Sequence, residues 1–321
     1  MPLFSKIINN LQKKTPLTIV STTNVRNWAL RRCMLDEMRD ASFGAKDSGF
    51  LAEPFFEAMF PWKQNNVLLN DQMALPSGDT SNVHNIIRRL HVNRDNEPIP
   101  RLYEHQAKAL KSIREGKSIV VTTGTGSGKT ECFMYPIYDY LARQVENGES
   151  IGGVQALFLY PLNALIESQG DRFRKFCATF NQWCRERDVA DRVHFANYTG
   201  KMEETFDDAI KSIRENLQNI EPNVSERQLR DRYAYSSYDE IISRDILRSN
   251  PPQFLITNST MLEYAMVRKQ DAPLFRNANG RSPLKFIVLD EAHTYSGSNA
   301  AELALRLRRV LEAFGTTPDQ V

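Results

Sequence analysis

Short apolar runs alternate with longer helix-prone stretches through the C-terminal two thirds of the chain. Each run is nearly continuous in β-branched, aromatic and other apolar residues. Strands of this composition are typical of parallel sheets whose two faces are both covered by helices. The pattern therefore predicts an α/β fold, with a mainly parallel sheet covered by helices, over residues 96–321. The predicted strands are Ser118–Thr123, Gln155–Tyr160, Val193–Tyr198, Gln253–Thr257 and Lys285–Asp290.

The N-terminal part of the chain has a different pattern, in which apolar residues recur at helical spacing. Residues 7–11 and 28–38 are two such groups. Pro98 and Pro100 then mark a boundary, because proline interrupts both helices and sheets. We expect residues 1–95 to be a mostly helical accessory region. A packed accessory domain fits this pattern, and so does a surface that docks a partner or contacts DNA.

Charge and composition indicate where the protein is located but do not identify its substrate. The 321-residue chain has a formal net charge of +2 and a pI of about 8.3, so a basic groove is neither required nor excluded. Residues 201–250 are charged and helix-prone, which predicts a helical insertion on the sheet. The four cysteines show no C-x-x-C spacing, and no apolar run is long enough to cross a membrane. We therefore expect a cytoplasmic protein with no membrane partner.

A glycine-rich segment between a predicted strand and a predicted helix is the strongest local signal. Residues 122–130 read T-T-G-T-G-S-G-K-T, and such glycines let several backbone N–H groups turn toward one phosphate chain. The helix that follows adds the positive end of its dipole. Lys129 would reach the β and γ phosphates, and the Thr130 hydroxyl would bind Mg²⁺. The residues predicted to bind ATP in this loop are Thr125, Gly126, Ser127, Gly128, Lys129 and Thr130.

The segment departs at one place from the general phosphate-loop pattern G-x-x-x-x-G-K-[ST]. Thr123 occupies the position of the first glycine, whereas the T-G-S-G-K-T core is intact. An ordinary glycine turn is the alternative, but the strand–loop–helix context favours nucleotide binding.

An acidic pair ends the last predicted strand. Asp290 and Glu291 open the sequence D-E-A-H directly after an apolar run. Consecutive side chains diverge at a strand end, so Asp290 can hold Mg²⁺ while Glu291 accepts a proton from the attacking water. A solvated turn is the alternative for an isolated acidic pair. Lys129, Asp290 and Glu291 form the predicted catalytic set, and Thr130 and Asp290 are the predicted metal ligands.

Together these motifs resemble those of the superfamily 2 DEAD/DEAH-box helicases, over about residues 97–315. The resemblance implies a RecA-like P-loop NTPase domain. The segment R-L-Y-E-H-Q at 101–106 is similar to the Q motif of this family, so Gln106 would read the edge of adenine. A glutamine amide offers the donor and the acceptor that this edge requires. In the family, the histidine of D-E-A-H couples the nucleotide site to a second domain, which gives His293 a coupling role.

Three further segments resemble the loops with which the family holds a single nucleic-acid strand. Y-P-L-N-A-L at 160–165 is similar to motif Ia, Y-T-G at 198–200 to motif Ib, and T-N-S-T-M-L at 257–262 to the segment that follows. Contacts of this kind reach phosphates and are independent of base sequence. Plain loops between strands and helices are the alternative. The nucleic-acid residues that the resemblance implies are Pro161, Leu162, Asn163, Thr199, Gly200, Thr257 and Asn258.

D-E-A-H-T-Y-S-G and Y-P-L-N-A-L are also similar to the bacterial helicases related to the YprA group, which act mostly on DNA. The family's motif III and its second RecA-like domain, which supplies an arginine finger, do not follow His293 in this sequence. We therefore interpret the chain as the ATP-binding half of an ATP-dependent helicase or translocase, with ATP and Mg²⁺ as cofactors.

The partners implied by this interpretation are nucleic acid, DNA rather than RNA, and a second RecA-like domain in a longer chain or a separate subunit. Two alternatives remain at this point. One is a catalytically silent module that binds ATP and nucleic acid, as a truncated or split helicase would. The other is a P-loop ATPase of a non-helicase type.

Overall fold

The computed structural model describes residues 10, 14–23, 25, 27–40, 62–64, 85–93, 97–99, 101–124, 126–217, 220–221, 223–275 and 283–321. The chain divides into two compact units, residues 1–61 and 62–321. In the smaller unit, residues 14–22 are helical and α2 spans Trp28–Asp40. The accessory role predicted for this region stays a prediction. No helix in the described part of the chain combines the length and apolar character that a membrane crossing needs.

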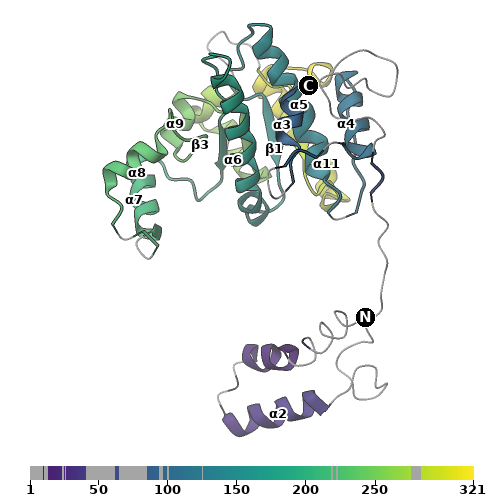
Figure 1. Ribbon diagram of the computed structural model, residues 1–321, viewed down its shortest axis with the longest axis vertical. Helices are drawn as coiled ribbons and strands as arrows, with labels where there is room; N and C mark the ends of the chain where they lie inside the picture. The colour runs from purple at the N-terminus through teal and green to yellow at the C-terminus, as the bar shows by residue number, and fades with distance from the viewer. Residues whose placement is uncertain are drawn as a thin grey trace. The chain divides into compact units, whose positions relative to one another are not determined.

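Five parallel strands form the sheet of the larger unit (Figure 1). In chain order they are β1 (Ala156–Leu159), β2 (Phe195–Tyr198), β3 (Glu240–Ile241), β4 (Phe254–Thr257) and β5 (Phe286–Leu289). Their spatial order is β3-β2-β4-β1-β5. Leu159 stands beside Thr257 on one side and Leu289 on the other, so neighbouring strands end at one common edge. The predicted α/β fold with a parallel sheet is confirmed.

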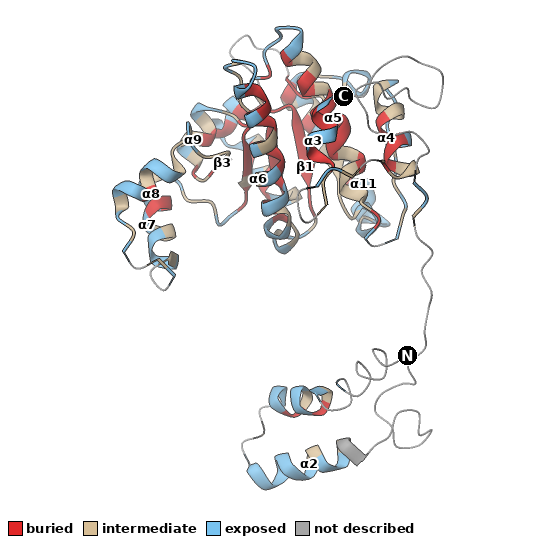
Figure 2. Cartoon of the chain, in the orientation of Figure 1, coloured by how far each residue is buried: buried red, intermediate tan, exposed pale blue. Residues whose placement is uncertain are grey.

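Side chains of β1 alternate between two hydrophobic cores, one on each face of the sheet. Phe158 and Tyr160 belong to the first core, and Leu157 and Leu159 to the second. The helices of the first core are α3 (Asn85–Leu90), α4 (Glu104–Arg114), α5 (Lys129–Glu146) and α6 (Asn163–Arg185). Those of the second are α9 (Arg244–Ser249), α10 (Ser259–Val267), η1 (Lys269–Leu274) and α11 (Ser298–Phe314). Figure 2 shows the buried residues gathered on the strands and on the helix faces that cover them. Burial on both faces explains why the strands read as continuous apolar runs.

One predicted strand, Ser118–Thr123, is not a strand in the structure. The segment follows α4 (Glu104–Arg114) and leads into the glycine-rich loop. Val120 is 90% exposed, and β5, at the edge of the sheet, is only half buried. An apolar run becomes a strand only where a neighbour offers backbone partners. Among the described residues, none pairs with the outer side of β5, so this segment stays outside the sheet.

The predicted helical insertion contains α7 (Phe206–Leu217), α8 (Glu226–Tyr233) and α9, together with the short strand β3. Helices α7 and α8 form an arm that projects away from the sheet (Figure 1). Arg230 of α8 pairs with Asp207 of α7 at 2.6 Å, and the buried residue of α8 is Leu229. Ion pairs between α7 and α8 therefore stabilise the arm together with a small apolar contact.

Residues 85–93 pack as part of the larger unit, although the sequence pattern groups them with the N-terminal region. The apolar side chains of α3 are buried in the first core. His91 follows this helix, and its Nε2–H donates to the Arg101 carbonyl at 3.0 Å while its Nδ1 lies 2.7 Å from the Tyr135 hydroxyl. Burial lowers the pKa of His91, so this imidazole is a neutral packing element.

Candidate nucleotide site and nucleic-acid interface

The glycine-rich loop ends at the N-terminus of α5. Gly126 and Gly128 have φ angles of 74° and 76°, in the left-handed region that glycine adopts without a steric penalty. Gly128 is the N-cap of α5, and no side chain caps that helix end. The N–H groups of Lys129 and Thr130 therefore have no acceptor within the helix, and such an end is suited to bind phosphate. Thr125, predicted with this set, lies outside the described residues.

Side chains from α4 hold the backbone of the loop. His105 Nε2 donates to the Ser127 carbonyl at 2.8 Å, and Gln106 Nε2 donates to the Gly128 carbonyl at 3.2 Å. Within the loop, the hydroxyl oxygens of Thr123 and Ser127 lie 2.6 Å apart. Protein contacts from α4 and within the loop therefore hold its backbone in this shape. The sequence assigned no role to His105, and its place beside Gln106 in the Q-like segment is the signal that could have suggested one.

Gln106 is engaged at both ends of its amide. Its side chain is buried, and its Oε1 accepts a hydrogen bond from the Tyr103 N–H at 3.0 Å, at the start of α4. A β-carbon on Gly128 would lie 2.5 Å from Gln106 Nε2. Gln106 thus joins the start of α4 to the start of α5. The adenine contact proposed for it stays a prediction.

The acidic pair lies directly after β5, at the same edge of the sheet as the end of β1. The Asp290 N–H donates to the Leu159 carbonyl at 3.1 Å, so β1 fixes where the pair begins. Glu291 has a φ of 50° and a ψ of 40°, a left-handed conformation that costs a non-glycine residue about 1–3 kcal/mol. The chain turns at this residue into the 3-10 helix η2 (Ala292–Thr294). Strained backbone of this kind is concentrated at functional sites.

Charge links the acidic pair to the loop. Burial raises the pKa of Asp290 and the Glu291 carboxylate raises it further, whereas the Glu291 N–H and the positive charges of Lys129 and Arg172 lower it. Lys129 therefore lies close enough to Asp290 for their charges to interact. His293 Nδ1 lies 3.2 Å from Glu291 Oε2, and the His293 side chain is 76% exposed. His293 is thus positioned at the outer side of the site.

The donor set fits a nucleoside triphosphate with a hard divalent cation. The start of α5 offers N–H groups and the Lys129 ammonium, while the Thr130 hydroxyl and the Asp290 carboxylate are oxygen ligands of the kind that Mg²⁺ prefers. The described ranges contain no cluster of three His, Cys, Asp or Glu side chains that could hold a metal by itself.

The residues predicted to contact nucleic acid follow β1, β2 and β4 at their carboxyl ends. Asn258 Nδ2 donates to Asn163 Oδ1 at 2.7 Å, and Asn258 Oδ1 caps α10 by accepting from the Met261 N–H at 2.8 Å. This pair brings together the loops after β1 and β4. Leu162, the N-cap of α6, is 62% exposed and provides no side-chain cap. The uncapped start of α6 is therefore open to an anion.

Thr257 differs from the other predicted contacts because its side chain is fully buried. Its hydroxyl donates to the Tyr198 carbonyl at 2.7 Å. This bond joins β4 to β2 and leaves the hydroxyl inaccessible to a ligand. Thr199 is also buried, whereas Gly200 beside it is exposed.

Comparison with known families falls on the part of the chain that carries this loop. Residues 103–205 match the family model of the DEAD/DEAH box helicases. This part of the chain is therefore similar to the DEAD/DEAH box helicase family. It is 28% identical over 275 residues to the Druantia protein DruE of Escherichia coli (strain UMEA 4076-1), which covers 65% of this chain and 15% of that protein.

Two relatives named as ATP-dependent helicases are similar to this chain at about the same level of identity. The uncharacterized ATP-dependent helicase YprA of Bacillus subtilis is 26% identical over 225 residues, covering 68% of this chain and 22% of YprA. ATP-dependent helicase hrq1 of Schizosaccharomyces pombe is 26% identical over 238 residues, covering 72% of this chain and 17% of that protein. The chain thus spans less than a quarter of the length of these relatives. Among solved structures, the DUF1998 helicase MrfA bound to DNA and AMPPNP matches with a TM-score of 0.47 and 20% identity, over 79% of this chain and 26% of that chain.

Proposed function

We propose that this chain is the ATP-binding half of an ATP-dependent nucleic-acid helicase or translocase. The observation that carries the proposal is the pairing of two features: a glycine-rich loop that opens α5 with an uncapped helix end, and an acidic pair held at the end of β5 by the Asp290–Leu159 hydrogen bond. Phosphoryl transfer needs a phosphate-binding loop and an acidic residue that serves the metal ion in one place. Two motifs far apart in the sequence supply them here. Relatives named as ATP-dependent helicases support the same conclusion.

Each residue of the site has a distinct task in this proposal. The N–H groups at the start of α5 bind phosphate oxygens, and Lys129 neutralises the β and γ phosphates. Thr130 and Asp290 would hold Mg²⁺, which stabilises the charge that develops during transfer. Glu291 orients the attacking water and accepts its proton. His293, exposed and in contact with Glu291, carries the state of the site to a second domain.

A single nucleic-acid strand is proposed to lie along the edge formed by the starts of α6 and α10 and by Gly200. The uncapped start of α6 and the exposed Gly200 suit contacts to phosphate, which are independent of base sequence. We favour DNA over RNA as the substrate because the sequence is similar to the YprA group. Phosphate contacts alone do not distinguish the two, since they do not read the 2′-hydroxyl.

We infer that full turnover requires a second RecA-like domain, from a longer chain or a separate subunit. In motors of this class the second domain supplies an arginine, which accelerates phosphoryl transfer by about 10³–10⁵-fold. The chain alone is therefore expected to bind ATP and to hydrolyse it slowly.

The test compares the wild-type chain with Lys129→Ala and with the control Lys117→Ala. Lys117 is an exposed lysine outside the loop that pairs with Glu115 at 2.6 Å, so its loss changes the net charge equally without removing a loop residue. A fluorescent ATP analogue should bind the wild type and the control but not Lys129→Ala. Equal affinity in all three chains refutes the phosphate site.

Turnover measured with and without single-stranded DNA or RNA then completes the assignment. Stimulation by one nucleic acid identifies the preferred substrate. Binding of both ligands without any turnover favours the catalytically silent module.

A further inference from the structure

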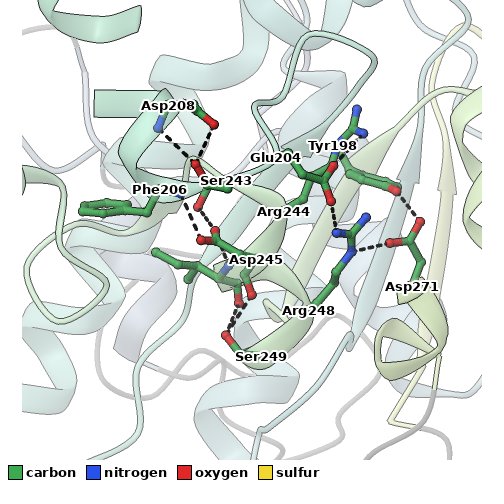
Figure 3. A network of polar contacts seen from close by, with 12 residues as sticks. Tyr198, Glu204, Phe206, Asp208, Ser243, Arg244, Asp245, Arg248, Ser249 and Asp271 are labelled. Atoms are coloured by element: carbon green, nitrogen blue, oxygen red, sulfur yellow. Dashed lines mark hydrogen bonds and ion pairs between the residues drawn. The ribbon is translucent and has the colours of Figure 1, made fainter. Parts of the chain in front are cut away.

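A polar network joins the helical insertion to the loop after β2 (Figure 3). At its centre is Asp271, whose fully buried carboxylate accepts from the Tyr198 hydroxyl at 2.6 Å and from Arg248 Nε at 2.7 Å. Arg248 also pairs with Glu204, and Glu204 accepts from Arg244 Nη1 at 3.3 Å. Three segments far apart in the sequence therefore meet here: residues 198–204, residues 244–248, and η1.

Arg244 is the residue through which this network reaches the predicted nucleic-acid loop. Its Nη2 donates a long hydrogen bond, 3.4 Å, to the Thr199 carbonyl, which also accepts from the Met202 N–H at 3.2 Å. Its guanidinium lies 5.8 Å from the centre of the Tyr198 ring. The side chain is only 14% exposed. Arg244 therefore turns inward, onto the loop and the strand end, and not toward the open edge.

The base of the insertion fixes where Arg244 stands. Glu203 and Ser243 form a parallel bridge, and the Arg244 N–H donates to the Glu203 carbonyl at 3.0 Å. The chain thus closes on itself before and after the α7–α8 arm. These contacts at the base of the insertion can therefore hold the loop after β2 without help from α7 and α8.

We propose that Arg244 is a positioning residue for nucleic-acid binding, which holds the turn at Thr199 and Gly200 in the shape that receives a phosphate. The inference rests on the proposed function of this edge. A β-carbon on Gly200 would meet no atom within 4 Å, so the space beside the turn is open to a ligand. The planar guanidinium can bond the Thr199 carbonyl and Glu204 together, a geometry that the point charge of lysine cannot reproduce. The insertion is thereby part of the interface through its base.

The experiment uses the full chain as wild type, Arg244→Ala, Arg244→Lys and the matched control Arg230→Ala. Arg230 is also an ion-paired arginine of the insertion, but it lies on the arm. Affinity for a labelled single-stranded DNA oligonucleotide is measured by fluorescence anisotropy over a range of salt concentrations. Affinity for an ATP analogue and the deuterium exchange of the Met202 amide are measured in parallel.

Arg244→Ala should weaken DNA binding about tenfold, the effect of losing a charge-assisted hydrogen bond. The dependence of log K on log salt should keep its slope, ATP-analogue affinity should not change, and the Met202 amide should exchange faster. Arg244→Lys should bind as weakly as Arg244→Ala, and Arg230→Ala should bind as the wild type does.

Two results overturn the proposal. One is DNA affinity in Arg244→Ala equal to that of the wild type. The other is a salt slope shallower by about 0.7 with affinity restored in Arg244→Lys, which would mean that Arg244 contacts a phosphate itself. If Arg244→Ala does not fold, Glu204→Gln replaces it, because that change weakens the hold on both arginines at an exposed position. A wild-type chain that binds the ATP analogue but no DNA or RNA refutes the proposed edge, whereas Met202 exchange still reports whether Arg244 holds the loop.

Discussion

Gly128→Ala should destabilise the larger unit more than Gly126→Ala does, although both glycines have nearly the same φ. An alanine at either position adopts a left-handed conformation, at a cost of about 1–2 kcal/mol. At Gly126 a new β-carbon meets nothing within 4 Å. At Gly128 it lies 2.5 Å from Gln106 Nε2 and 3.1 Å from Glu131 Oε2. The difference between the two variants therefore isolates the steric contribution.

The magnitude follows from how Gln106 is held. The end of a glutamine side chain normally moves aside easily, but this one is buried and bonds both the Tyr103 N–H and the Gly128 carbonyl. Moving it breaks two hydrogen bonds, each of about 0.5–1.5 kcal/mol, so Gly128→Ala should cost about 1–3 kcal/mol more than Gly126→Ala. Glu131 needs to shift by only a few tenths of an ångström. In thermal unfolding, each kcal/mol lowers Tm by about 2–4 °C for a unit of this size.

A double-mutant cycle with Gln106→Ala identifies the cause. In that background the clashing amide is gone, so the added cost of Gly128→Ala should fall to the cost of Gly126→Ala. Equal Tm values for the two glycine variants, or an added cost that persists without Gln106, would show that Gln106 does not lock the loop.

Two further predictions concern the acidic pair and the nucleic-acid edge. Glu291→Gln should leave ATP-analogue affinity unchanged and lower any hydrolysis about 10²–10⁴-fold, because the proton acceptor is lost; steady-state turnover checks this, and undiminished turnover removes Glu291 as the base. Asn258→Ala should lose the cap of α10, about 0.5–2 kcal/mol of unfolding free energy, and also the bridge to Asn163. Asn258→Ser keeps a capping oxygen but not the bridge, so it should weaken nucleic-acid binding in anisotropy measurements while lowering the urea midpoint less than Asn258→Ala does. Wild-type affinity in the serine variant contradicts a role for the bridge.

Much of the sheet can be predicted from hydrophobic pattern alone. The strands β1, β2, β4 and β5 all fall within the apolar runs, because strands covered on both faces of a sheet favour apolar side chains at most positions. Strand β3 was not predicted, since its two residues, Glu240 and Ile241, form a strand only because β2 lies beside them. The segment Ser118–Thr123 is the opposite case: it has the composition of a strand, but it pairs with no strand in the described part of the chain. The hydrophobic pattern shows that a segment can form a strand, but it does not show whether another strand lies beside it.

The candidate site also has a part that the sequence predicts and a part that it does not. The glycine-rich loop and the acidic pair are local motifs, so their positions can be identified from the sequence. The contacts that shape them are not local. Gln106 reaches Gly128 across the start of α4, and Arg244 reaches Thr199 across the whole insertion. The burial of Thr257 depends on the pairing of β4 with β2, which no property of the T-N-S-T segment reveals.

The hydrogen bond between Asn163 and Asn258 has a mechanical consequence. Helix α6, which begins at Asn163, packs on one face of the sheet, and α10, which begins after Asn258, packs on the other. The bond therefore ties the two helical layers together around the rim of the sheet, with no strand between its partners. A sliding motion of one layer past the other would stretch this 2.7 Å contact before it disturbed either core. The hydrogen bond between the two asparagines therefore resists sliding of the two helical layers. If a bound ligand slid one layer past the other, this bond would break.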